Sequence, residues 1–455
     1  MSLVSLDLIR NCLEGFVPSV MATCDAEGLP NVSLISQVHY VGADRVALSY
    51  QFFNKTRRNM LATRCASVLV ADPLTLAQYR LTLDYLETEA EGPLFEVMKA
   101  KLAGIASHSG MQGVFRLLGA DIYQVRSIEQ IAPPMLACPP PERNLLSAIR
   151  RSCAALSGCC DFGLLLERTL DCLETEFGIR HAMITMLDDQ AGRLYTIASR
   201  GYPQSGIGSE FMLGEGVIGV AAREGVPIRI GQMTSEDEYS NAVRESARAA
   251  GTDWAEKTRI PYPGLDAPQS QLALPIVCAG RTLGVLFAES LDPMRFWYDD
   301  EDALAAVAGH LGALIAVLHG AEEPAAALAP PAPAPVPVPS GLPLMVRYYH
   351  ADSSVFFDTH YVIKGVAGAI LWKLLREHLR DGREEFSNRE LRLDPELRLP
   401  DHAENLEARL VLLYRRLAER DAPVRIEKAG RGRFRLVVSS SLVLEAVGAG
   451  RGEAA

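Results

Sequence analysis

AEEPAAALAPPAPAPVPVPSGLP, residues 321–343, alternates proline with alanine and valine and separates the last part of the chain from the rest. Proline fixes φ and has no backbone donor, so this stretch predicts an extended, semi-rigid spacer rather than a packed element. A second proline-rich linker, APPMLACPPPER, covers residues 132–143. Two linkers predict three domains. We expect them at residues 1–131, 144–320 and 344–447, with a short tail at 448–455.

The bulk composition fits several globular domains. The 455 residues are 48% hydrophobic and 22% charged, close to the average for folded proteins. The N-terminal stretch MSLVSLDLIRNCLEGF lacks the basic region and apolar run of a signal peptide, and no apolar run approaches the roughly 20 residues that span a bilayer. We therefore expect a cytoplasmic protein without a membrane partner.

Charge is spread unevenly along the chain. The net charge of −11 argues against a protein that is basic over its whole surface, as a nonspecific nucleic-acid binder would be. Residues 361–437 nevertheless contain more lysine and arginine than aspartate and glutamate. Any contact with nucleic acid is therefore expected at the C-terminal end.

The cysteines and histidines do not form a ligand pattern. Nine cysteines occur without a C-x-x-C pair, and no H-E-x-x-H motif is present, so we expect reduced thiols and no metal site. Cys153, Cys159 and Cys160 lie close together, which leaves redox sensing as an alternative. No residue presents itself as a nucleophile or as a paired acid and base, so we expect no catalytic residue.

The first domain contains short β-type runs separated by turn signals, which predicts a small antiparallel barrel. Its stretches ATCDAEGLPNVSLIS, RVALSY with NKTRRNM, ASVLVADP and GADIYQV follow one another in the order and spacing of a known family. In these stretches the domain resembles the pyridoxamine-phosphate-oxidase-like, FMN-binding split-barrel family. The resemblance covers nearly the whole domain.

The resemblance implies a flavin site after the third predicted strand. The family holds the FMN phosphate near this position, and the chain offers a cluster of donors there: Lys55, Thr56, Arg57, Arg58 and Asn59. His39 and Tyr50 are candidates to face the flavin ring. The chain departs from the family at 31–35, where a phosphate-binding arginine is often found and Asn-Val-Ser-Leu-Ile stands instead. The alternative is a solvated basic turn.

The second domain begins with two amphipathic helices in residues 144–178, ending at Gly178, where a C-cap is expected. Strands follow in HAMITMLDD, RLYTIASRGY and QLALPIVCAGRTLGVLFAES, and the segment closes with a long apolar helix over 299–319. This order resembles the GAF family across the whole segment. The resemblance implies a central antiparallel sheet, and many members of the family hold a small ligand over it.

Two features of this domain suggest partners. The segment 234–257 is a candidate cover for a ligand pocket, with Tyr239 and Trp254 either contacting a planar ligand or serving only as packing residues. The helix at 299–319 has more apolar positions than one sheet face needs. We therefore expect the terminal helices to form a homodimer.

The third domain combines helices with a basic ribbon. In the predicted helix ENLEARLVLLYRRLAER, Leu406, Leu410, Leu413 and Leu417 form one stripe, which leaves Arg415 on the opposite side. The ribbon PVRIEKAGRGRFRLVV alternates and is rich in arginine. Helix and ribbon together predict a basic surface.

This arrangement resembles the winged helix of OmpR-like response regulators, on the RRL end of the helix and the Gly-aromatic-Arg-Leu end of the wing. The chain departs from the family at Val411 and Leu412, where polar base-reading residues are usual, and at an extra Arg433 before Phe434. The resemblance implies DNA as partner, through arginines on both elements: Arg409, Arg415, Arg416, Arg431 and Arg433. The alternative is a winged helix that binds protein, its arginines paired with Glu404, Glu407 and Glu427.

Taken together, the sequence predicts a multidomain α+β protein built from a split barrel, a GAF domain and a winged helix. The leading hypothesis is a sensory or transcriptional regulator in which the first two domains sense a small ligand, a redox change or a partner and control DNA binding. The alternatives are an FMN-dependent oxidoreductase with regulatory domains and a scaffold that binds proteins.

Overall fold

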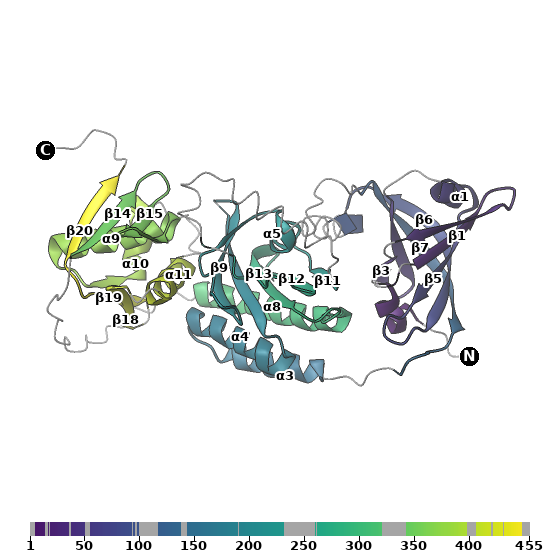
Figure 1. The fold of residues 1–455 in the computed structure, drawn as a ribbon, viewed down its shortest axis with the longest axis horizontal. Helices are drawn as coiled ribbons and strands as arrows, with labels where there is room; N and C mark the ends of the chain where they lie inside the picture. The colour runs from purple at the N-terminus through teal and green to yellow at the C-terminus, as the bar shows by residue number, and fades with distance from the viewer. Residues whose placement is uncertain are drawn as a thin grey trace.

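The chain forms three units in a row, shown in Figure 1 from purple at the N-terminal unit to yellow at the C-terminal unit. The structure is a computed structural model. It describes residues 5–13, 17, 19–35, 38–50, 55–92, 94–95, 98–99, 117–137, 143–189, 191–231, 260, 262–320, 343–397, 406–419, 422–430 and 432–447. The fold is multidomain α+β with several antiparallel sheets. Most of the expected linker at 321–343, the middle of the linker at 132–143 and the tail at 448–455 lie outside the described residues.

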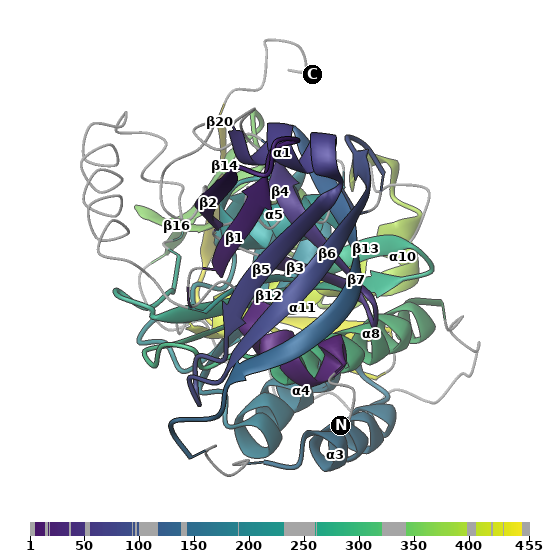
Figure 2. The same ribbon diagram turned by 90° about the vertical axis from the view of Figure 1, so that its right-hand side faces the viewer.

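The N-terminal unit is a seven-stranded antiparallel sheet in the order β2-β1-β5-β6-β7-β4-β3. Figure 2 shows its long strands β5, β6 and β7 side by side. The elements are η1 (Leu6–Leu13), β1 (Ser19–Cys24), β2 (Pro30–Ile35), β3 (Val38–Gly42), β4 (Arg45–Tyr50), α1 (Lys55–Thr63), β5 (Cys65–Ala71), β6 (Gln78–Glu89) and β7 (Gly119–Ala132). In β5, Ala66, Val68 and Val70 alternate into the core, as a strand with one buried face requires.

The middle unit is a six-stranded antiparallel sheet in the order β10-β9-β8-β13-β12-β11. Its elements are α3 (Leu145–Ser157), α4 (Phe162–Phe177), β8 (His181–Asp188), β9 (Arg193–Arg200), β10 (Glu210–Met212), α5 (Gly216–Glu224), β11 (Ile228–Ile230), β12 (Ser270–Cys278), β13 (Arg281–Ser290) and α8 (Tyr298–Gly320). Helix α4 begins at the N-cap Asp161 and ends, as the sequence predicts, at Gly178, which has φ 63°.

Helix α8 belongs to the core of the middle unit. Among the described residues it is the one helix long and apolar enough to cross a membrane, and 44% of that stretch is buried inside the protein. Leu304, Val307 and Leu311 are almost fully buried. A Cβ at Gly312 would lie only 2.5 Å from the carbonyl oxygen of Val277, so a glycine lets the helix approach β12 closely.

The C-terminal unit has two small sheets around three helices. Its elements are β14 (Leu344–Tyr349), β15 (Ser354–Phe357), β16 (His360–Ile363), α9 (Gly365–Asp381), β17 (Glu385–Ser387), α10 (Asn388–Arg392), η2 (Pro395–Leu397), α11 (Leu406–Glu419), β18 (Val424–Lys428), β19 (Arg433–Val438) and β20 (Leu442–Val447). The sheets run β16-β15-β14-β20 and β17-β19-β18. Strand β20 pairs in parallel with β14 and so fastens the end of the unit to its beginning.

One hydrophobic core continues from the middle unit into the C-terminal unit. The leucine stripe predicted for α11 is buried, with Leu406, Leu410, Leu413 and Leu417 each at most 3% exposed. These leucines belong to the same cluster as Leu170 and other residues of the GAF-like segment. In Figure 1, α11 lies on the side of its unit that faces β9. The two units therefore pack directly on each other.

Candidate functional site

The residues predicted to bind a flavin phosphate lie on α1, but the strongest donor among them is already occupied. The guanidinium group of Arg57 forms a bidentate pair with Asp121, with Nε 3.2 Å from Oδ2 and Nη2 3.1 Å from Oδ1. Nη2 also donates to Thr88 Oγ1 at 3.0 Å, and the guanidinium carbon lies 3.6 Å from the centroid of the Tyr50 ring. The side chains of Arg57 and Asp121 are only 14% and 7% exposed. This arginine therefore stabilises the fold of the N-terminal unit.

The other four residues of the cluster divide between core and surface. Asn59 is buried, and Thr56 is buried while accepting a hydrogen bond from Asn31 Nδ2 at 2.8 Å. Thr56 Oγ1 in turn donates to Ser33 Oγ at 3.1 Å. Lys55 is half-buried and Arg58 is exposed. The five residues thus do not form one convergent donor set, and a phosphate here would meet chiefly Lys55 and the hydroxyl groups beside it.

A buried acidic group lies in the middle unit at the end of β13. Glu289 is 1% exposed, accepts a hydrogen bond from the Leu265 backbone N–H at 2.7 Å and another from Gln271 Nε2 at 3.1 Å. Burial raises the pKa of this carboxyl group, partly opposed by those hydrogen bonds. Burial and the nearby carboxylate also raise the pKa of the Tyr202 phenol. Glu289, Gln271 and Tyr202 form a polar cluster inside the middle unit.

Tyr239 and Trp254, the residues suggested to cover a ligand, lie outside the described residues. Among the residues that the structure does describe, no group of three or more potential metal ligands is found. Burial raises the pKa of the Cys153 and Cys159 thiols, which disfavours the reactive thiolate at neutral pH.

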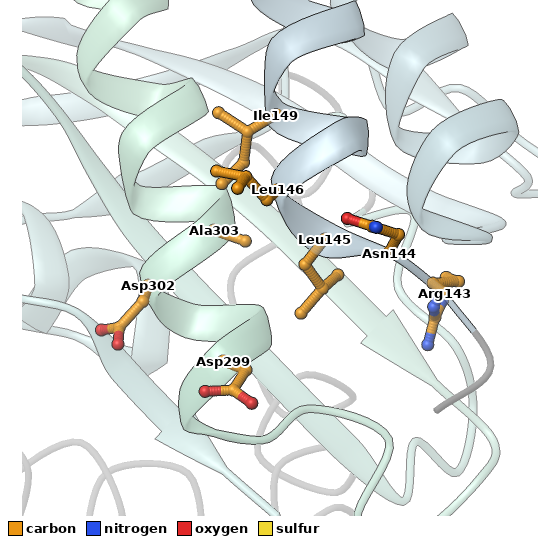
Figure 3. Close-up of a pocket in the computed structure, with 8 residues that line it drawn as sticks. All are labelled: Arg143, Asn144, Leu145, Leu146, Ile149, Asp299, Asp302 and Ala303. Carbon is orange, nitrogen blue, oxygen red and sulfur yellow. The ribbon is translucent and has the colours of Figure 1, made fainter. Parts of the chain in front are cut away.

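A shallow pocket of about 600 Å³ lies between α3 and α8, where Figure 3 shows leucine side chains of α3 beside the first turns of α8. Its apolar residues include Leu145 and Leu146, and Asp299 and Asp302 stand on its rim. Asp302 pairs with Arg10 of the N-terminal unit at 2.9 Å. The pocket therefore lies next to a contact between the first two units.

The arginines predicted on α11 face the middle unit. Arg409 Nη2 lies 2.5 Å from Asp188 Oδ2, and the guanidinium carbon lies 4.3 Å from the centroid of the Tyr195 ring. Arg415 Nη2 lies 2.6 Å from Glu167 Oε1, and its Nη1 donates to the Ile197 carbonyl oxygen at 2.8 Å. The sequence placed these arginines on a free basic surface. In the structure they form an interface between two units.

The remaining arginines predicted to contact DNA are Arg416, Arg431 and Arg433. Arg416 is buried, donates to the Val362 carbonyl oxygen at 3.3 Å and pairs with Glu419 at 3.1 Å. A Cβ at Gly208 of the middle unit would lie 3.7 Å from its Cδ, so this arginine also lies at the interface. Arg433 on β19 is exposed, and Arg431 lies outside the described residues. The described part of the basic surface that remains open therefore belongs to the ribbon of β18 and β19.

The two apolar residues of α11 that replace the usual polar base-reading residues also lie in this interface. Val411 and Leu412 are 8% and 4% exposed. A Cβ at Gly163, on α4, would lie 3.9 Å from Val411 Cγ2, and one at Gly208 would lie 3.8 Å from Leu412 Cδ1. These two side chains pack on the middle unit, which explains why α11 carries them instead of polar residues.

Sequence reasoning missed the acidic partners of these arginines. Asp188, Glu167 and Asp121 lie far along the chain from Arg409, Arg415 and Arg57, and nothing in their local sequence separates them from other surface acids. Only Asp188 carries a weak signal, since it ends a predicted strand with a second aspartate after it.

Comparison with known proteins identifies the middle unit. The GAF domain family model matches residues 161–316, so this part of the chain is a GAF domain, which indicates a sensory or regulatory role. Helix α3 precedes the matched residues. No curated protein matches the chain.

Solved structures are similar to parts of the chain at low identity. The GAF domain of an Acinetobacter phosphoenolpyruvate-protein phosphotransferase is 19% identical, covers 39% of this chain and 96% of its own, and has a TM-score of 0.31. A free methionine-R-sulfoxide reductase from Neisseria meningitidis is 18% identical, with coverages of 37% and 87% and a TM-score of 0.29. An FMN-binding protein from Syntrophomonas wolfei is 15% identical, with coverages of 28% and 88% and a TM-score of 0.24.

Replacing Arg57 with alanine is expected to destabilise the N-terminal unit by about 3–5 kcal/mol, because it leaves Asp121 buried without its cation. Chemical denaturation of the full chain measures this change. Arg58→Ala, at the exposed neighbouring position, is expected to stay within about 0.5 kcal/mol of the parent protein. Equal effects of the two substitutions would contradict a structural role for the Arg57 pair.

The raised pKa of Glu289 predicts a pH-dependent stability of the GAF domain. Because the folded state holds the proton more tightly, the free energy of unfolding falls as pH rises from about 4.3, the ordinary glutamate value, through the raised folded pKa. Glu289→Gln is expected to remove this fall, which amounts to at most about 1.4 kcal/mol per pH unit. Unfolding curves between pH 4 and 8 test it, with the exposed Glu174→Gln as control. An unchanged slope in Glu289→Gln would refute it.

Proposed function

We propose that the protein is a GAF-based sensory regulator whose C-terminal unit is a winged-helix output domain that binds DNA. The observation that carries the proposal is the element order β14-β15-β16-α9-β17-α10-α11-β18-β19, in which three helices are followed by an arginine-rich antiparallel ribbon. This order supports the resemblance of the sequence to the OmpR-like winged helix. Its third helix is the one that contacts the GAF domain.

The ribbon supplies the accessible charge. Arg425 on β18 and Arg433 on β19 are both exposed. Guanidinium groups on such a ribbon suit phosphate oxygens, which position a protein on a duplex without reading its sequence. The ribbon thus provides a basal, salt-sensitive attachment to DNA.

The sensory half of the proposal rests on the GAF domain. Its buried Glu289 cluster and the helical pair α3 and α8 offer a polar interior and a dimerisation surface, respectively. Leu146 and Val317 are 77% and 65% exposed on that helical pair, which supports pairing with a second copy of the chain.

A flavin at the N-terminal unit is a second candidate. The hydrogen-bonded group of Asn31, Ser33 and Thr56 adjoins Lys55, so neutral donors and one cation stand together at the start of α1. Arg57 and Asn59 would take no part, because the first is paired and the second is buried. A bound flavin would add redox or light-absorbing chemistry to the sensor.

Replacing Arg425 and Arg433 together with alanine is expected to weaken binding of the full chain to a labelled duplex. Each lost phosphate contact should make the salt dependence shallower by about 0.9 units of slope. Fluorescence anisotropy from low to moderate salt measures both changes. The half-buried Arg347 and the exposed Arg380 of the same unit supply the control double substitution with the same loss of charge. Identical curves for the two double variants would count against DNA contact by the ribbon.

For the flavin candidate, the double variant Lys55→Ala and Thr56→Ala is expected to purify with less FMN than the parent protein, since it removes the one cation and a hydroxyl group beside the phosphate. The absorbance spectrum near 450 nm of the purified proteins reports the content. Arg64→Ala, after α1 on the same unit, serves as the control. A parent protein without flavin, or a variant with full stoichiometry, would exclude this site.

A further inference from the structure

The side of α11 that a winged helix presents to a duplex is covered by the GAF domain. Arg409 and Arg415 are 10% and 17% exposed, and their charges are matched by Asp188 and Glu167. Val411 and Leu412, between them in the sequence, are buried against the same domain. In this arrangement no duplex can reach the helix.

The carboxylates that contact Arg409 and Arg415 are the same kind of acceptor as the DNA phosphates that they exclude. A guanidinium group binds carboxylate and phosphate oxygens in the same way, through charge-assisted hydrogen bonds of similar length. Asp188 and Glu167 therefore occupy the two arginines just as backbone phosphates would. The two contacts are mutually exclusive and compete for the same donors.

Further polar pairs join the two units around the contacts of Arg409 and Arg415. Lys364 Nζ lies 2.9 Å from Glu210 Oε2, Lys428 pairs with Asp161, and Ser205 donates to Glu419. Contacts that are charged and partly exposed are typical of interfaces that open and close, since water and salt can replace them. The long proline-rich linker would keep the two units near each other when the contact is open.

The contact also reaches the central sheet of the GAF domain. Asp188 ends β8 and Ile197 lies in β9, two inner strands of its sheet. Met183 of β8 and Leu194 of β9 pack in the second GAF core with α5, on the other side of the sheet. A change on that side can therefore alter the strands that hold the arginines.

We propose that the GAF domain is an intramolecular inhibitor of DNA binding, which masks α11 through Asp188 and Glu167 until a signal on the GAF domain releases it. The inference rests on the proposed function, because it specifies how the DNA-binding unit is regulated. It assigns to two acidic residues of the GAF domain the role of phosphate competitors.

The test removes the carboxylates without touching α11. In the full chain, the double variant Glu167→Gln and Asp188→Asn is expected to bind a labelled duplex about fivefold or more tightly than the parent protein. Its salt dependence should steepen by about 1.8 units, because two further arginines reach phosphates. The matched control is Glu176→Gln with Asp189→Asn. It removes the same charge from neighbouring positions, whose partners are Arg151 and Arg281 rather than α11.

A disulfide provides the opposite test. Gly163→Cys with Val411→Cys joins α4 to α11, at positions where a Cβ on residue 163 would lie 3.9 Å from Val411 Cγ2. Oxidation is expected to lower DNA affinity, and reduction of the same sample should restore it. Each single cysteine variant controls for the native thiols.

The outcomes separate the two proposals. If the parent protein binds DNA and neither the charge variant nor the disulfide changes its affinity, the GAF domain does not inhibit DNA binding. The proposed DNA-binding function then stands. If no variant binds DNA, although the disulfide forms and is reduced, the proposed function itself is wrong and there is nothing to mask. Tighter binding by the control double variant to the same extent would also overturn the mask.

Discussion

The contact of α11 with the GAF domain determines how the C-terminal half of the protein is arranged. Two arginine–carboxylate pairs hold the helix by its charged side, and its leucine stripe fills the core of its own unit. The helix is thus enclosed on both sides. A linker limits the distance between two units but sets neither their orientation nor their contact. The arrangement therefore depends on the chemistry of this one surface.

The energetics of that surface explain why it suits a switch better than a permanent joint. Bringing two charges together out of water gains little net stability, whereas removing one partner is costly because the other charge remains buried. Arg–carboxylate pairs therefore specify which surfaces meet more than they add affinity. Val411 and Leu412 supply apolar contact beside these pairs, within the hydrophobic cluster that continues from one unit into the other.

The N-terminal unit also contains a buried arginine–carboxylate pair, but there the pair lies within a single unit. Arg57 belongs to the densest group of donors in this unit, yet Asp121, Thr88 and the Tyr50 ring satisfy its guanidinium group. Buried and bidentate, this pair connects α1 to β7 and holds the sheet together. What remains for a ligand is Lys55 with neighbouring hydroxyl groups, a weaker and more neutral site than the composition suggests.

The sequence by itself determined the elements whose signals are local. Apolar periodicity, the turn residues and Gly178 predicted the helices and strands of the GAF domain, and the stripe of Leu406 to Leu417 predicted the buried face of α11. It could not determine which acids meet Arg57, Arg409 and Arg415, because ion pairs join residues far apart in the chain and any surface carboxylate is a possible partner. It treated Val411 and Leu412 as lost base-reading positions, whereas the packing of two units makes them contact residues. Apolar periodicity indicates which residues are buried, but only the tertiary structure decides which residues they contact.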